Sequence, residues 1–373
     1  MRFLNSQSQT DTQELANVYK IISETKDERR AGRGKVLAIL QYIRNRSHTL
    51  RSLSSPPTTS IIDNPPSKYL KEELSITVTR RHQAFPELIQ LNNDSSVSPI
   101  DSAAANECCG LVLRETKGDW EVVCYPFDKM FHFHGTDKDL DTLPLEGFQW
   151  GEAKLFEQPI GVSMYLFHYE GSWLLSSSQN NVFLRNLKER IVAHTSITDA
   201  EFQSQLDALF WTWWHRLRYS LPEDKTLCYM FRFYVEPFPA FPFVATSSNQ
   251  KEEELEKDEQ HHKAYILLTG VRDQQSFLEL WPSAIAERYG WQCVKERPDI
   301  YKAALDESDP SSDVATPSIG FVKKTLRALL EVSRDVSLLD SSGFVLCDPA
   351  FKKIVLHSPQ YQDLYRLRRF TNR

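Results

Sequence analysis

The chain has 373 residues, of which 41% are hydrophobic and 25% are charged, and its formal net charge at pH 7 is −6. This composition is ordinary for a globular protein, and it excludes a wholly disordered chain, a collagen-like repeat and a coiled-coil rod. The negative charge argues against a general nucleic-acid coat protein, although it leaves room for a local basic groove. At about 150 residues per domain, the length predicts two or three units.

No stretch approaches the roughly 18 consecutive apolar residues that a membrane helix needs. The polar run after Met1–Leu4 lacks the apolar core of a secretory signal. We therefore expect a soluble, intracellular protein, in the cytoplasm or the nucleus, with no membrane partner. The six cysteines include no C-x-x-C pair, so we expect reduced thiols and no metal site.

Residues 1–66 predict two segments outside the main body. Apolar residues at helical spacing over 11–48 predict a helical N-terminal extension that occupies residues 1–48. Its basic end, from Arg29 to Arg46, is either a solvated helix face or an arm that binds nucleic acid. Residues 49–66, rich in Ser, Thr and Pro, are expected to form a linker. The body of the protein then occupies residues 67–373.

The first half of the body reads as strands and hairpins. Turn residues between β-prone runs predict hairpins at 110–125 and 162–176. Apolar and aromatic residues at helical spacing predict a helix over 198–218, and an aromatic, proline-interrupted run follows at 226–244. The acidic stretch 246–262 is expected to be a disordered insertion, because it has too few apolar side chains to offset the entropy of ordering.

The C-terminal part mixes strands and helices. We expect a strand at 264–271 and helices near 274–289 and 319–334, with a polar loop at 306–313 between these helices. A strand, a turn, a strand and a helix should follow over 343–370. Because the helices do not alternate regularly with the strands, the pattern predicts an α+β fold and not a doubly wound parallel sheet.

The common enzyme motifs are absent: the sequence has no phosphate-binding P-loop, no dinucleotide fingerprint, no G-x-S-x-G and no H-E-x-x-H. Three separated stretches nevertheless form an ordered pattern. The first joins Leu88–Asn92 to Asn106–Leu113 and Val122–Phe131, the second is Phe156–Met164, and the third pairs Ala264–Asp273 with Ser342–Val345 and His357–Tyr361.

In order, spacing and turn positions, these stretches resemble the bacteriophage T4-type RNA ligases, which are covalent nucleotidyltransferases. That family reads E-C-R-G-L and P-F-x-K-F-F-N in the first stretch, E-K-x-D-G-S-L in the second, and E-G-F-V with K-x-K-S-P-x-Y in the third. The resemblance covers residues 66–370. It implies an α+β nucleotidyltransferase domain of antiparallel sheets around a central cleft, with the N-terminal helices outside.

The resemblance also implies a mechanism. In the family, the lysine of E-K-x-D-G attacks the ATP α-phosphate, AMP then passes to an RNA 5′-phosphate, and a 3′-hydroxyl displaces it. That lysine must lose its proton to act as a nucleophile. The developing phosphoryl charge needs further cations and a divalent metal that carboxylates hold.

The charged groups of this mechanism are missing from the sequence. In E-K-x-D-G, Gln158 replaces the nucleophilic lysine and Ile160 replaces its acidic partner. Cys109 replaces the arginine of E-C-R-G, and Ser178 replaces the cation that follows the second stretch. Arg232 and Ser342 replace two carboxylates, the second of them that of E-G-F-V, and Val355 and His357 replace the paired lysines. The residues that a fold needs remain, namely Gly110, Phe127, Phe131, Gly161, Gly343, Phe344, Pro359 and Tyr361. An alignment slip would have lost both kinds of residue.

Three hypotheses follow. The first is a catalytically degenerate RNA-ligase-like protein that acts as a nucleotide- or RNA-binding or scaffold module. The second is an active ATP-dependent RNA ligase that uses displaced residues and needs ATP and Mg²⁺, with Lys352 and Lys353 replacing the lysine pair. Lys154 is the obvious substitute nucleophile, but four residues along a strand move its amine by about 13 Å. The third is an unrelated enzyme that reuses the pocket.

For the first hypothesis, the residues of a remaining nucleotide or RNA pocket are Glu157, Gly161, Lys129, His132, Arg232 and His357, with His134 nearby. Histidine and arginine side chains can hold a phosphate or a base edge without a lysine nucleophile. No metal ligand and no covalent step are expected at these positions. The sequence names no protein partner and no cofactor outside the ligase hypothesis.

Overall fold

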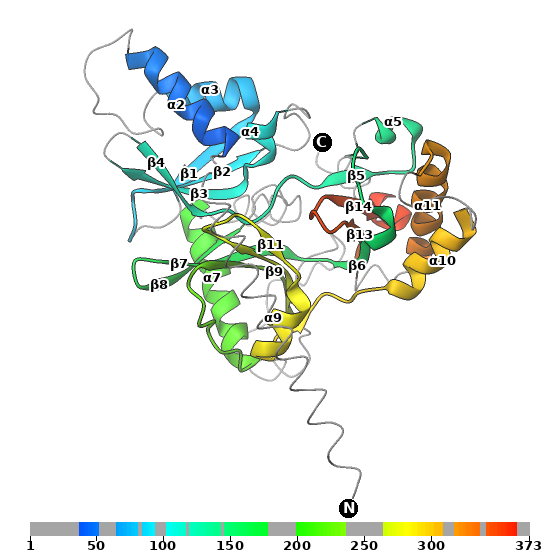
Figure 1. Cartoon of the computed structure of the whole chain (residues 1–373). Helices are drawn as coiled ribbons and strands as arrows, with labels where there is room; N and C mark the ends of the chain where they lie inside the picture. Colours follow the sequence, from blue (N-terminus) through cyan, green and yellow to red (C-terminus); the bar gives the residue numbers. More distant parts are fainter. Residues whose placement is uncertain are drawn as a thin grey trace, which may run out of the picture.

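The computed structural model describes residues 37–51, 65–80, 84–93, 102–116, 119–141, 143, 145–177, 199–235, 264–308, 317–335 and 341–363. In these ranges the chain forms three β-sheets with helices packed against them (Figure 1). The predicted insertion at 246–262, residues 1–36 of the predicted extension and residues 52–64 of the predicted linker lie outside the described residues.

The first sheet is antiparallel, in the order β1–β2–β3–β4. Its strands are β1 (Ile76–Arg80), β2 (Leu88–Asn93), β3 (Cys109–Thr116) and β4 (Asp119–Cys124). β3 and β4 pair from Thr116 opposite Asp119 to Val112 opposite Cys124. This pairing confirms the hairpin predicted at 110–125.

Three helices lie over this sheet in Figure 1: α2 (Ala38–Arg51), α3 (Pro65–Leu74) and α4 (Ala103–Asn106). Leu37, Ile39 and Ile43 are buried in one cluster with Leu91 of β2. The described part of the predicted extension is therefore part of the first sheet's core and does not stand outside it. The physical reason is that an apolar helix face is stable only when it packs on another apolar surface.

The second sheet is six-stranded, in the order β11–β10–β9–β7–β8, with β12 beside β10. Its strands are β7 (Val162–Tyr169), β8 (Ser172–Ser177), β9 (Leu227–Val235), β10 (Ala264–Asp273), β11 (Glu279–Leu280) and β12 (Gln292–Cys293). All pairs are antiparallel except β10 with β12. The hairpin predicted at 162–176 is confirmed, and its turn places Glu170 and Gly171 at positive φ.

Two helices pack against the second sheet: α7 (Asp199–Arg216), which confirms the helix predicted at 198–218, and α9 (Pro282–Tyr289). Phe210 and Trp214 of α7 are buried with Tyr229, Phe231 and Phe233 of β9. These three strand residues alternate along β9, so the residues between them face the opposite side of the sheet. That opposite side carries the pocket described below.

The third sheet has the order β5–β14–β13–β6. Its strands are β5 (Phe131–Phe133), β6 (Lys154–Pro159), β13 (Ser341–Cys347) and β14 (Lys353–His357). β14 runs parallel to β5, and the other pairs are antiparallel. Two helices pack on this sheet, α10 (Pro298–Ser308) and α11 (Ile319–Val332). The remaining short elements are α5 (Asp137–Leu140) and two 3₁₀ turns, at Trp150–Glu152 and Ser333–Asp335.

The structure corrects one helix prediction and one loop prediction in the C-terminal part. The helix predicted near 274–289 begins only at Pro282, because the Asp273 carboxylate accepts hydrogen bonds from the backbone N–H groups of Gln275 and Ser276 and holds a turn there. Residues 306–308 of the predicted loop are helical, because α10 continues to Ser308, and residues 309–313 lie outside the described residues. The helix predicted at 319–334 is confirmed as α11.

Close approach of the backbone requires glycine at two positions. Gly161, between β6 and β7, has φ +122°, and a Cβ there would lie 2.3 Å from the Phe233 carbonyl oxygen. Gly343 of β13 has φ +138°, and a Cβ there would lie 2.0 Å from the Leu356 carbonyl oxygen. Only glycine fits such positions.

The described residues form a mixed α+β fold with mostly antiparallel sheets, as the sequence predicted. Among them, no helix is both long and apolar enough to cross a membrane.

Candidate functional site

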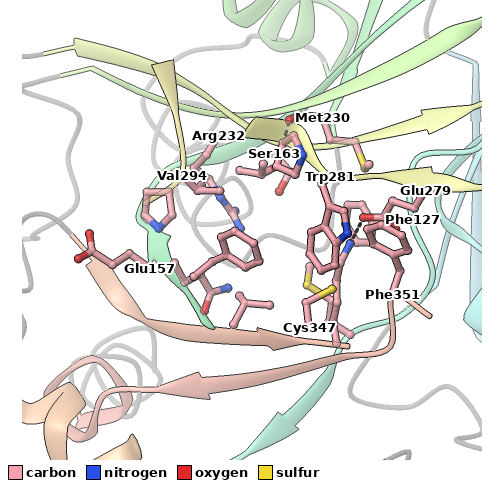
Figure 2. A pocket seen from close by; sticks show the side chains of 18 of the residues that line it. Phe127, Glu157, Ser163, Met230, Arg232, Glu279, Trp281, Val294, Cys347 and Phe351 are labelled. Carbon is pink, nitrogen blue, oxygen red and sulfur yellow. Dashed lines mark hydrogen bonds and ion pairs between the residues drawn. The ribbon is translucent and has the colours of Figure 1, made fainter. Parts of the chain in front are cut away.

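A pocket lies between the second and third sheets, with an empty volume of about 720 Å³ that includes its opening to solvent (Figure 2). Its walls come from strands of both sheets and from the segments that follow β4, β11 and β13. The lining residues are Phe127, Met130, Phe156, Glu157, Gln158, Pro159, Ser163, Tyr165, Met230, Arg232, Thr269, Glu279, Trp281, Pro282, Val294, Val345, Cys347, Phe351 and Lys353.

Strand alternation decides which side chains of the second sheet reach the pocket. Phe231 and Phe233 of β9 point to α7, and so Met230 and Arg232 point to the pocket. On the neighbouring strand β7, Ser163 is the residue directly opposite Arg232. Residues opposite one another on antiparallel strands carry Cβ atoms about 5 Å apart, so these two polar side chains are neighbours in the pocket wall.

Arg232 is the unusual charge of this wall. Its Nη1 donates a hydrogen bond of 3.3 Å to the Gly161 carbonyl oxygen, and no carboxylate pairs with it among the described residues. Burial lowers the pKa of Arg232, with an opposing contribution from the nearby tyrosines Tyr165, Tyr361 and Tyr265. A guanidinium nevertheless stays protonated in proteins, so the pocket holds a positive charge with no counter-ion from the described residues.

Glu157, in contrast, is paired with cations that lie outside the pocket. Its Oε1 accepts a hydrogen bond of 2.8 Å from Arg297 Nη1 and lies 4.0 Å from Lys295 Nζ. Figure 2 shows the Glu157 carboxylate directed away from Trp281 and the aromatic side of the pocket.

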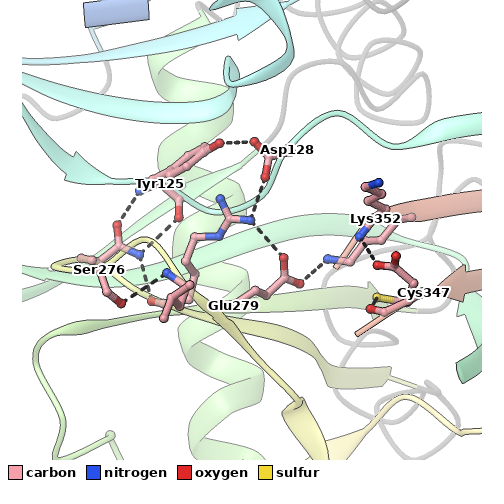
Figure 3. Close-up of polar contacts among 11 residues, drawn as sticks. Tyr125, Asp128, Ser276, Glu279, Cys347 and Lys352 are labelled. Carbon is pink, nitrogen blue, oxygen red and sulfur yellow. Dashed lines mark hydrogen bonds and ion pairs between the residues drawn. The ribbon is translucent and has the colours of Figure 1, made fainter. Parts of the chain in front are cut away.

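The second carboxylate of the pocket, Glu279, is also paired twice. It accepts a hydrogen bond of 3.1 Å from Arg272 and a second one from Lys353, and its side chain is 3% exposed. Arg272 in turn donates to Asp128 at 3.0 Å, and Asp128 accepts from the Tyr125 hydroxyl (Figure 3). This chain of polar contacts joins the segment after β4, the second sheet and β14.

Gln158 occupies the position that the resemblance gives to the nucleophilic lysine, and it lines the pocket with 8% of its surface exposed. Its side-chain oxygen is buried, and no hydrogen-bond donor reaches it among the described residues. Its backbone carbonyl accepts hydrogen bonds from Ser341 Oγ at 2.9 Å and Ser342 Oγ at 3.1 Å. The serine at the position of the family carboxylate thus ties β13 to β6.

Lys154, Lys352 and Lys353 each have a polar partner. Lys154 lies over the Trp281 ring, 4.9 Å from its centroid, and its Nζ is 3.4 Å from Glu296 Oε2. Lys352 donates to the Glu146 carbonyl oxygen at 2.6 Å and does not line the pocket. Lys353 lines it through the pair with Glu279.

Aromatic side chains form the side of the pocket opposite Arg232 in Figure 2. The Trp281 ring lies 4.7 Å from Phe351 and 5.9 Å from Phe156, centroid to centroid. Phe127 contacts Tyr165 edge-to-face at 5.7 Å. Such a surface can accept a flat apolar ring, while the opposite side presents a positive charge.

The three predicted histidines meet outside the pocket lining. His132, His134 and His357 stack in one group, and His132 Nδ1 lies 3.2 Å from His357 Nε2. Burial, then the neighbouring His134 and Lys129, lowers the pKa of His132 to about 4. Burial and the other histidines also hold the pKa of His357 well below its usual value. Both rings are therefore neutral at pH 7.

The remaining predicted positions that the structure describes do not line the pocket. Cys109 is buried at the start of β3, and burial raises the pKa of its thiol to about 12. Ile160 packs with Tyr234 and Tyr265, and Val355 is buried in β14. Gly161, Lys129, His132 and His357 are not among the lining residues, and Ser178 lies outside the described residues. The predicted positions that the structure brings to the pocket are Glu157, Gln158 and Arg232.

Several lining residues were not singled out from the sequence, above all Ser163, Glu279 and Trp281. The alternation of β7 and β9 would have placed Ser163 beside Arg232 once the pairing was known. Glu279 and Trp281 fell in a segment expected to be helical, so neither was considered for the site.

The described residues do not fit a divalent metal at this site. No three His, Cys, Asp or Glu side chains in the described ranges converge as metal ligands would. Both lining carboxylates already have cationic partners. Mg²⁺ prefers carboxylate oxygens in near-octahedral geometry, and these oxygens are committed to ammonium and guanidinium groups.

No protein-family model matches the chain, and no curated protein matches it in sequence. Among solved structures it is similar to an archaeal ATP-dependent RNA ligase, at 10% identity and a TM-score of 0.37, over 84% of the chain and 65% of the ligase. It is also similar to a Naegleria gruberi RNA ligase variant with ATP and manganese, at 10% identity and a TM-score of 0.29, over 59% of the chain and 53% of the ligase. The chain thus spans less than two thirds of these ligases, and the similarity does not single out the T4-type enzymes.

Proposed function

We propose that this protein is a catalytically degenerate relative of the RNA ligases that binds the phosphate of a nucleotide or of RNA in the pocket between its second and third sheets. The observation that carries the proposal is Arg232, a cation in the pocket wall with no carboxylate partner among the described residues. A half-buried charge without a counter-ion is costly, and a bound anion reduces that cost.

The nucleophile position supports the degenerate half of the proposal. Gln158 carries an amide whose nitrogen is conjugated with its carbonyl and cannot form a lysyl-type adenylate. Lys154 and Lys353 are the nearest alternatives in sequence and in the pocket, and each is ion-paired. Each amine is thus held against a carboxylate and is not free to attack a phosphate.

The first prediction is that the protein forms no covalent adenylate. Incubation with α-labelled ATP and magnesium or manganese, followed by denaturing electrophoresis, should leave the protein unlabelled. Gln158→Lys alone should remain unlabelled too, because the other charged groups of the mechanism are still replaced. Electrostatic groups of this kind typically contribute several kcal/mol each to the transition state.

One observation favours the second candidate, an active ATP-dependent RNA ligase with displaced residues. Lys353, which the sequence offered as a stand-in for the terminal lysine pair, does line the pocket. A labelled band in the same assay would support this candidate. Lys353→Met, Lys154→Met and an exposed control such as Lys302→Met would then locate the adenylate, since only the nucleophile variant loses it.

A further inference from the structure

The carboxylates of the pocket are paired with cations of the protein and are not free to bind a metal ion. Each of its two carboxylates is held by two cations: Glu157 by Arg297 and Lys295, and Glu279 by Arg272 and Lys353. Arg232 has only the Gly161 carbonyl oxygen. Asp128, on Arg272, and Asp299, on Arg297, compensate the second cation of each group. Among the described lining residues, the cation left without a carboxylate is therefore Arg232.

This arrangement disfavours a magnesium-bridged ligand. A divalent cation would have to displace Arg272 or Lys353 from Glu279, or Arg297 from Glu157, and would then lie among the displaced cations. Breaking a buried pair leaves an unpaired charge in the protein, which is strongly unfavourable. An anion placed on Arg232 needs no such rearrangement.

We propose that the pocket binds a terminal phosphate monoester directly on the Arg232 guanidinium, with the Ser163 hydroxyl as a second donor and without a bridging divalent cation. This inference rests on the proposed phosphate-binding function and narrows it. A planar guanidinium fork matches two oxygens of one phosphate group. One uncompensated cation suits a monoester better than a triphosphate, whose larger charge normally requires a metal.

Two neighbouring side chains support this site. Ser163 is directly opposite Arg232 in the pairing of β7 with β9, and both line the pocket. The Gln158 side-chain oxygen is buried beside the pocket without a donor among the described residues. A ligand that brings a hydroxyl or amino group along with its phosphate would satisfy this acceptor, as a nucleoside monophosphate or an RNA 5′ end can.

The test is isothermal titration calorimetry of the full chain with AMP, adenosine, ATP, a 5′-phosphorylated oligoadenylate and its 5′-hydroxyl counterpart. Each titration is run in EDTA and in magnesium. We expect AMP or the 5′-phosphorylated RNA to bind with the same affinity in both buffers. Adenosine and the 5′-hydroxyl RNA should bind more weakly. The AMP and RNA arms distinguish a free nucleotide from an RNA end as the source of the phosphate.

Variants test the contacts themselves. Arg232→Met should weaken phosphate binding at least about tenfold, since it removes a charge-assisted pair, and Ser163→Ala should weaken it less. Arg334→Met makes the same change at an exposed arginine outside the pocket and should leave binding unaltered. Glu157→Gln should not weaken binding, because it removes a negative charge from the pocket lining and no contact to the phosphate. Thermal unfolding of each variant checks that the fold is retained, and Arg232→Lys provides a second variant that keeps the charge.

The outcomes separate the two proposals. Phosphate binding that requires magnesium, or that survives Arg232→Met in a folded variant, overturns the metal-free site and leaves the proposed function standing. Glu157→Gln that weakens binding in magnesium but not in EDTA would mark Glu157 as a metal ligand and also overturn the metal-free site. If no nucleotide or RNA binds in either buffer, the proposed function fails and this inference fails with it.

Discussion

At the scale of single residues, the stacked histidines are the group that responds most to pH. A ring nitrogen of His132 lies against a ring nitrogen of His357. One imidazole can donate a hydrogen bond to the other only while the accepting ring is neutral. Lys129, Arg232 and His134 add positive charge around them, and no acidic residue contributes among the groups that shift their pKa values. A second proton on this pair therefore meets both burial and repulsion.

We predict that the protein loses stability as the pH falls below the unfolded-state histidine pKa of about 6.5. The folded-state pKa of His132, about 4, is depressed, so the unfolded state binds the proton first and unfolding is favoured on acidification. His132 alone should lower the free energy of unfolding by about 2 kcal/mol between pH 7 and pH 5. Urea unfolding at a series of pH values measures this loss.

His132→Phe should flatten that pH dependence, whereas His215→Asn, at an exposed histidine near the end of α7, should leave it in place. An unchanged pH profile in His132→Phe would show that other groups cause the acid sensitivity.

At the scale of elements, the contact between β13 and β14 depends on a missing side chain. A Cβ at Gly343 would meet the Leu356 carbonyl oxygen at 2.0 Å and the Ser358 backbone nitrogen at 2.9 Å. Both are backbone atoms of the β14 segment, which cannot move without disrupting the pairing of Gly343 with His357.

We therefore predict that Gly343→Ala destabilises the protein by more than about 3 kcal/mol, through strain and loss of strand pairing. Gly171→Ala is the matched control, because this glycine also has positive φ, +82°, but a Cβ there meets nothing within 4 Å. It should cost only about 1 kcal/mol. Equal losses in chemical unfolding of the two variants would contradict the steric argument.

Elements with strong local signals were predictable from the sequence, and elements set by distant contacts were not. The hairpins β3–β4 and β7–β8 have turn residues between alternating runs, and α7 has a periodic aromatic face, so local pattern sufficed. The docking of α2 on the first sheet was missed, because only tertiary burial reveals that its apolar face has a partner. The first part of the predicted 274–289 helix failed because one side chain, Asp273, holds a turn.

The same division applies to the site. The order of the motifs brought attention to Gln158, Glu157 and Arg232, and all three line the pocket. The ion pairs that decide the pocket's charge could not be read from the sequence. Glu279 and Lys353 are separated by 74 residues, and their contact depends on how the second and third sheets meet.

At the scale of the whole molecule, Glu279 joins the three sheets. It receives Arg272 from its own sheet and Lys353 from β14, and Arg272 continues to Asp128, which follows β4 (Figure 3). The side chains of Arg272 and Glu279 are 4% and 3% exposed. Removing the central charge would leave two buried cations facing each other.

Glu279→Gln should therefore lower the free energy of unfolding by about 3 kcal/mol or more. Adding Lys353→Met should recover part of the loss, because it removes one of the stranded cations, and the double-mutant cycle measures this coupling. Glu223→Gln, which breaks an exposed pair with Arg288, should cost under about 1 kcal/mol. If Glu279→Gln lowered the free energy of unfolding as little as Glu223→Gln does, the ion pairs of Glu279 would contribute little to stability.

The topology of the third sheet has a consequence for how the chain is made. β5 and β6 are synthesised early, yet they flank β13 and β14, the last strands in the sequence, and Ser341 of β13 pairs with Pro159 of β6. Closing such long loops is slow, because the chain loses entropy before distant contacts reward it. During translation, β5 and β6 therefore lack their partner strands until β13 and β14 have been synthesised. The pocket is incomplete until β14 has left the ribosome. Such edges are sites where a growing chain can mispair, so the completion of this sheet depends on the last strands of the described chain.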